Sequence, residues 1–309
     1  SSSLVKIFVS EEIKIFRRAT LASIITSTYP MIVVGCYFGV TPWNMNRLSI
    51  DESDLSFAIL LFGIFFIISN QIAGRILVPK YGTKLIMSLA FPLVTFSTLL
   101  SIVSPSYFYF LLTSIPAGIG WGASGPIGGI HTQLIEQHFK KIITPYYAMG
   151  FNLGILIGGG LAGIIMRYNY EPYIFLTILS FLSIFISFFV FSFGLPRNLD
   201  FKGVGEKFKI PETNVLLFGF LLFFIFGSGG IIMDWSTLWL SKDLNAPLYL
   251  ASMGLIFFSI GAIFANLFSN SLINLFSEKV VGCHFVMIGA SIMLCLLYTS
   301  PSPRDRISS

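Results

Sequence analysis

Charged side chains are scarce in this chain, and one long segment has none. Asp, Glu, Lys and Arg make up 11% of the 309 residues, and no charged residue occurs between Lys84 and Glu136. Soluble domains carry about 25% of these residues, so the composition excludes an ordinary soluble protein. The hydrophobic fraction of 55% and the mean hydropathy of +0.83 instead predict a protein that is surrounded by lipid.

Several chemical motifs are also missing. No Gly-x-x-x-x-Gly-Lys-Ser/Thr segment is present to cradle phosphates, so ATP-driven transport is unsupported. No His/Glu cluster lies in an apolar stretch, which argues against a membrane metalloprotease. We therefore expect no enzymatic activity, no catalytic residue, no cofactor and no metal site. Cys36 and Cys283 lie in apolar stretches and are expected to pack there rather than form a disulfide or hold a metal.

Nine apolar stretches separate short polar connections. A helix needs about 20 mostly apolar residues to cross the hydrocarbon core of a bilayer, and all but the last stretch meet or approach that length. This pattern predicts an all-α membrane protein. The predicted spans cover roughly residues 20–41, 55–73, 85–103, 106–130, 144–166, 172–194, 214–233, 248–268 and 280–294.

The basic residues fall mostly on alternate connections. Counted from the N-terminus, fourteen Lys and Arg residues lie on one side of the predicted spans and three (Arg47, Arg167 and Lys242) on the other. This positive-inside bias predicts a multi-pass protein of the cell (inner) membrane with a cytoplasmic N-terminus. The net charge of +5 is therefore a signal of topology, and we expect no nucleic acid partner.

The connections also divide the chain into parts. Residues 1–19 are predicted to form a cytoplasmic segment, either an interfacial helix or a solvated tail. The charged segment 196–213 is predicted to link a six-helix half, 20–195, to a partial second half, 214–294. Residues 295–309 include CLLYTSPSPRD, which matches a translated sequencing adapter, so we interpret them as a non-native tail. The given sequence is then expected to cut a longer native protein short in its ninth span. We expect this fragment to be inactive.

Glycines recur four residues apart in the fourth and fifth spans. This spacing places them on one helix face, where their small size lets helix backbones approach closely. We expect tight static packing at these faces, and the same smooth faces would also let helices slide or tilt. The fourth span has the pairs Gly118 and Gly122, and Gly125 and Gly129. The fifth span has the set of three Gly150, Gly154 and Gly158, and the pair Gly159 and Gly163.

The connection after the second span carries glycines among basic residues. Its features are Gly74, Arg75, Lys80, Gly82 and Lys84. This segment resembles the cytoplasmic signature loop of the major facilitator superfamily (MFS), although Val78 and Pro79 stand where that loop usually has an acid. The resemblance implies two six-helix bundles that expose a central cavity to each side of the membrane in turn.

Two further motifs resemble a bacterial, sugar-permease-like subgroup of that superfamily. Pro42-Trp43 with Arg47 follows the first span, and Asp234-Trp235-Ser236 lies near the outer end of the seventh. Gly125, Gly129 and Gly229 stand where that subgroup often has polar or acidic residues. The sequence thus lacks the membrane carboxylates that proton coupling commonly uses.

Candidate site residues follow from these positions. Tyr29, Tyr37, Trp121 and Asn152 lie on spans that line the cavity in the resembled family, and each could instead be a packing residue. Arg47 and Asp234 are candidates for a gating or coupling pair across the outer mouth. The alternatives are that Arg47 pairs with acids of its own loop and that Asp234 is a solvated helix end.

The sequence therefore predicts an MFS secondary transporter that moves a small solute by alternating access. A neutral, sugar-like solute is preferred because the expected cavity has aromatic residues and few charges. Efflux of apolar compounds and a non-transporting receptor or scaffold with the same fold are the alternatives. Expected partners are membrane lipid, the solute and a coupling ion, and the expected oligomeric state is a monomer.

Overall fold

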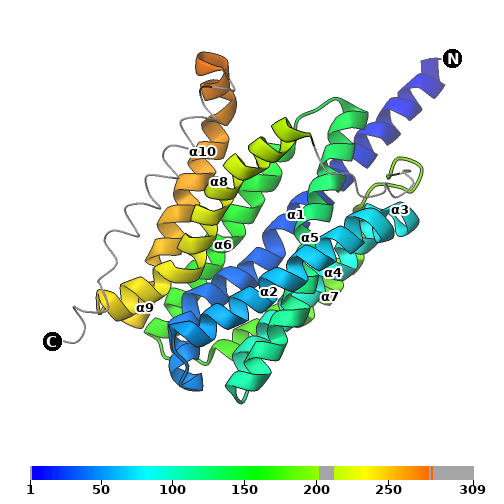
Figure 1. The fold of residues 1–309 in the computed structure, drawn as a ribbon. Helices are drawn as coiled ribbons and strands as arrows, with labels where there is room; N and C mark the ends of the chain where they lie inside the picture. The colour runs from blue at the N-terminus through cyan, green and yellow to red at the C-terminus, as the bar shows by residue number, and fades with distance from the viewer. Residues whose placement is uncertain (1, 202–211, 278–279, 281–309) are drawn as a thin grey trace.

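The protein is built from helices that are long enough to cross a membrane. The computed structural model describes residues 2–201, 212–277 and 280, and no strand occurs among them (Figure 1). The elements are α1 (Ser2–Leu48), α2 (Glu52–Ile72), the π-helical turn η1 (Ala73–Leu77), α3 (Val78–Tyr81), α4 (Thr83–Val103), α5 (Tyr107–Phe139), α6 (Thr144–Arg167), α7 (Pro172–Phe193), α8 (Thr213–Leu238), the π-helical turn η2 (Trp239–Asp243), α9 (Leu248–Ala251) and α10 (Met253–Phe276).

Eight of the nine predicted spans fall within these long helices, and the ninth, 280–294, lies outside the described residues. Six helical segments of the described part are long and apolar enough to cross a bilayer. The chain is therefore a multi-pass, all-α membrane protein, as the sequence predicts. The six segments are Glu11–Leu48, Glu52–Tyr81, Thr83–Val103, Thr144–Arg167, Pro172–Phe193 and Leu248–Ser269.

The helices alternate in direction, so their connections gather at two ends. We call the end that holds connections 79–83, 140–143 and 194–201 the linker end. The end that holds connections 49–51, 104–106, 168–171 and 239–247 is the far end. Helix α6 packs against α1 on one side and α10 on the other. Helices α8 and α10 thus lie beside the first six spans (Figure 1).

Two helix pairs approach closely through glycine. A Cβ on Gly154 or Gly158 of α6 would overlap the carbonyl oxygen of Thr28 or Ile32 of α1. Gly118 and Gly122 of α5 meet the backbone of α2 in the same way. The prediction of glycine packing is confirmed for these faces. It is wrong for Gly125 and Gly129, whose added Cβ atoms would meet no atom of the described residues within 4 Å.

The segment between the second and third spans is mostly helical, whereas the sequence suggested a loop. Helix α2 continues through η1 into α3, and the chain turns only at Gly82, whose φ is +86°. Pro79 lies near the start of α3, where the wider π-helical turn before it avoids the clash that proline causes inside an α-helix. Position 82 requires glycine, because its φ of +86° lies in the left-handed region that other residues rarely adopt.

The segment after α7 binds this turn. The buried carboxylate of Asp200 accepts hydrogen bonds from the backbone N–H of Thr83 (2.8 Å) and from its hydroxyl (2.7 Å). Arg197 donates from Nη2 to the carbonyl oxygen of Pro79 (3.0 Å). Asp200 therefore supplies a negative charge at the N-terminus of α4, where the helix dipole favours it.

Residues 2–19 are not separate from the first span, because α1 runs without a break from Ser2. Near the linker end, Phe16 and Ala19 pack with Ile135, Ile143 and Leu195. Helix α10 likewise continues to Phe276, eight residues past the predicted end of its span.

We predict that Gly154→Ala lowers the thermal unfolding midpoint in detergent. Overpacking of a tight interface costs about 1–3 kcal/mol, which exceeds the gain of about 1 kcal/mol from replacing a helical glycine by alanine. Gly125→Ala is the matched control and should leave the midpoint unchanged or raise it. Equal midpoints for the two variants would contradict the close approach of α1 and α6.

We also predict that Asp200→Ala destabilises the linker end. The loss of hydrogen bonds to a buried carboxylate corresponds to about 2 kcal/mol, and the N–H of Thr83 loses its partner. Limited proteolysis after Arg197 should become faster, together with a lower unfolding midpoint. Asn198→Ala, at an exposed position two residues away, is the control. Unchanged cleavage in Asp200→Ala would show that this contact does not hold the segment.

Candidate functional site

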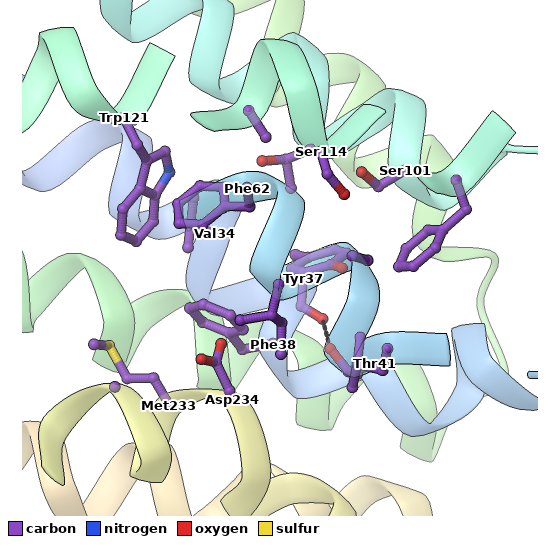
Figure 2. A pocket seen from close by; sticks show the side chains of 17 residues that line it. Val34, Tyr37, Phe38, Thr41, Phe62, Ser101, Ser114, Trp121, Met233 and Asp234 are labelled. Carbon is purple, nitrogen blue, oxygen red and sulfur yellow. Dashed lines mark hydrogen bonds between the residues drawn. The ribbon is translucent and has the colours of Figure 1, made fainter. Parts of the chain in front are cut away.

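A cavity of about 220 Å³ lies between α8 and the helices α1, α2, α4 and α5. Seventeen residues line it, and their side chains converge on a common space (Figure 2). All come from the half of each helix nearer the far end. Aromatic side chains form much of the wall: Tyr37, Phe38, Phe62, Phe110 and Trp121.

The helical repeat explains which residues reach the cavity. On α5 the lining residues are Phe110, Ser114, Ala117 and Trp121, spaced by three or four. Residues at this spacing lie on one face of an α-helix. The lining residues of α1, α2 and α8 follow the same spacing. The cavity is thus bounded by one stripe from each helix.

Four polar groups of the wall have no hydrogen-bond or ion-pair partner among the described residues. They are the carboxylate of Asp234, the hydroxyls of Tyr37 and Ser114, and the indole N–H of Trp121. By contrast, the hydroxyls of Thr41 and Thr98 donate to carbonyl oxygens one turn earlier in their own helices, at 3.0 and 2.8 Å. The four unpaired groups are therefore the ones that can bind a solute.

The cavity is closed at the far end. Leu238 at the end of α8 is buried in an apolar cluster with Ile50, Leu55 and Phe110. Outside this cluster, Lys242 donates to the Glu52 carboxylate at 2.8 Å and joins η2 to the start of α2. These contacts separate the cavity from the far end.

Toward the linker end the wall continues without large side chains. Gly125 and Gly129 follow Trp121 on the same face of α5, and a Cβ at either position would meet no described atom within 4 Å. Gly125 is exposed. The described residues therefore leave open space beside these two glycines of α5.

The structure brings three of the predicted residues together. Tyr37, Trp121 and Asp234 all line the cavity. Tyr29 does not: its hydroxyl donates to the carbonyl oxygen of Leu179 and its ring packs edge-on against Phe91. Asn152 does not either, because its amide donates at 2.9 Å to the carbonyl oxygen of Ala148 in its own helix. The packing interpretation holds for these two.

Arg47 and Asp234 are not paired in this conformation. The Arg47 guanidinium donates to Oδ1 of Asn44 (2.7 and 3.1 Å) and to the carbonyl oxygen of Ser104 (2.7 Å). It also lies over the ring of Trp43, 5.7 Å from its centroid. Arg47 therefore fastens α1 to the end of α4. Glu52, one of the three acids of the adjoining loop that were alternatives for pairing with Arg47, pairs with Lys242.

The signature residues lie at the linker end, away from the cavity. Arg75 donates to the side chain of Gln71 at 2.8 Å. The ammonium groups of Lys80 and Lys84 lie over the rings of Tyr81 and Phe191, at 5.1 and 4.7 Å. Gly74 has no close neighbour on its Cβ side. Of these residues, Lys80 and Lys84 flank the turn at Gly82, and none of the five lines the cavity.

Sequence reasoning missed several lining residues, notably Phe38, Phe62 and Ser114. The helical repeat contains the signal for one of them, since Ser114 lies seven residues, or two turns, before Trp121. Phe38 follows Tyr37 directly and shares its side of α1. No signal in the sequence distinguishes Phe62 from the other apolar residues of α2.

Among residues 2–201, 212–277 and 280, no group of three His, Cys, Asp or Glu side chains is placed to hold a metal ion. The cavity wall offers aromatic rings, the hydroxyls of Tyr37 and Ser114, an indole N–H and a carboxylate for noncovalent recognition.

Comparison with known proteins agrees with this architecture. The chain is 20% identical over 258 residues to an uncharacterised MFS-type transporter of Yersinia pestis, an alignment that covers 82% of this chain. The chain spans 64% of the length of that relative. The family model of the Major Facilitator Superfamily matches residues 19–304. The chain belongs to the Major Facilitator Superfamily.

Proposed function

We propose that this protein is a secondary transporter that moves a small solute across the inner membrane by alternating access, with its N-terminus in the cytoplasm. The observation that carries the proposal is a cavity between the first bundle and α8 whose far end is closed by the apolar cluster around Leu238. With the positive-inside orientation, the far end faces outward, so this conformation is the inward-facing one.

Transport requires the closing contacts to separate. The apolar cluster around Leu238 and the ion pair between Lys242 and Glu52 join α8 and η2 to the first bundle at the far end. Rocking of the second half about the cavity would open these contacts and close the space beside Gly125. An exposed ion pair contributes about 0–1 kcal/mol, so it can break in each cycle at little cost.

The solute must be small and at least partly polar. A neutral, sugar-like solute remains a candidate, since Trp121 offers a stacking surface and Tyr37 and Ser114 offer free hydroxyls. We leave Tyr29 and Asn152 out of this proposed binding set, because their polar groups bond carbonyl oxygens of the protein. Efflux of purely apolar compounds is less well supported, because it would leave four polar groups of the wall without partners.

Uptake measurements test the proposal. Vesicles that contain the full-length protein, with its second half complete, are expected to accumulate a labelled small solute, screened from monosaccharides and small organic ions, under an imposed pH or ion gradient. Trp121→Ala should reduce the uptake rate at least tenfold, because it removes the largest ring of the cavity wall. Trp239→Ala, an exposed tryptophan that does not line the cavity, is the control. Absence of gradient-dependent flux for every solute would contradict the proposal.

A crosslink at the far end tests alternating access directly. In a cysteine-free background, Glu52→Cys and Lys242→Cys should be joined by a short, reducible bifunctional thiol reagent, and uptake should then stop. Reduction of the crosslink should restore uptake. Continued transport by the crosslinked protein would contradict an obligatory opening of this contact.

A further inference from the structure

One charged residue lines the cavity, and its charge is not balanced by the described part of the chain. Asp234 is the single acidic or basic residue among the seventeen that form the wall. Figure 2 shows its carboxylate directed from α8 into the cavity, on the side of Phe38. None of the described lysine, arginine or histidine residues forms an ion pair or hydrogen bond with it.

The basic residues of the far end are engaged elsewhere. Arg47 is held by Asn44 and the carbonyl oxygen of Ser104. Lys242 is held by Glu52 at 2.8 Å, and Arg167 lies over the ring of Tyr249, 5.2 Å from its centroid. Each of these basic groups is therefore held by other partners and forms no ion pair with the Asp234 carboxylate.

A carboxylate at membrane depth is costly unless an opposite charge or a proton meets it. The walls of this cavity favour a particular opposite charge. Aromatic rings attract cations through their negative faces, and rings arranged around a site recognise ammonium groups that carry alkyl substituents. Tyr37, Phe38, Phe62 and Trp121 supply such rings beside the carboxylate. An inorganic cation would gain little binding free energy from these rings.

We propose that the cavity binds a small, monovalent organic ammonium ion, with Asp234 as its counter-ion and the aromatic side chains as its enclosure. This proposal rests on the proposed function, because it names the class of solute for the same cavity. The hydroxyls of Tyr37 and Ser114 then bind a polar group of the solute.

The size of the cavity limits the solute. A cavity of about 220 Å³ has room for a small organic cation, such as a hydroxylated trimethylammonium compound.

Binding of labelled choline to the purified chain in nanodiscs tests the proposal. Saturable binding is expected, and 3,3-dimethylbutan-1-ol, which has the same shape without the charge, should compete at least tenfold less well. Asp234→Asn keeps the size of the side chain and should weaken choline binding at least tenfold. Glu212→Gln removes an exposed charge from the start of the same helix and should leave binding unchanged.

The competing outcomes separate this inference from the proposed function. Equal competition by the neutral analogue, or unchanged binding in Asp234→Asn, would overturn the cation site. Displacement by a monosaccharide but not by organic cations would also overturn it and would favour the sugar-like solute. Choline binding that depends on Asp234, without flux in vesicles, would support the site and contradict transport. Circular dichroism of each variant shows whether it has folded.

Discussion

The absence of water in the hydrocarbon core is the constraint on which this structure depends. A backbone N–H or C=O without a partner costs several kcal/mol there, so a chain that crosses the core must satisfy these groups within each helix. Scarcity of charge and long apolar stretches follow from the same constraint. The hydroxyls of Thr41 and Thr98 are also satisfied within their own helices, because they donate hydrogen bonds to carbonyl oxygens there.

Lipid offers little hydrophobic driving force for helix association, so packing between backbones takes its place. The glycines of α5 and α6 provide this packing against α2 and α1. The first bundle is therefore closely joined, and the segment from Arg197 to Asp200 fastens its linker end. The cavity lies where this bundle meets α8, at a boundary that an apolar cluster of side chains seals near the far end.

The sequence predicted the spans well because their signal is the local hydropathy of about 20 residues. It predicted the cavity in part. Tyr37, Trp121 and Asp234 were found, but Tyr29 and Asn152 were misplaced, since a rotation of one residue on a helix, about 100°, decides between cavity and interface. The role of Asp200 could not be predicted, because the residue is separated from its partner Thr83 by 117 positions. Its binding depends on the fold and not on a local pattern.

The central claim is that Ser114 lies in a water-filled space inside the membrane that opens toward the linker end. The most direct test is modification of Ser114→Cys, in a cysteine-free background, by a membrane-impermeant thiol reagent in vesicles of each orientation. The account predicts rapid modification when the reagent is on the linker side and at least tenfold slower modification from the far side. Faster modification from the far side, or no modification from either side, would contradict it.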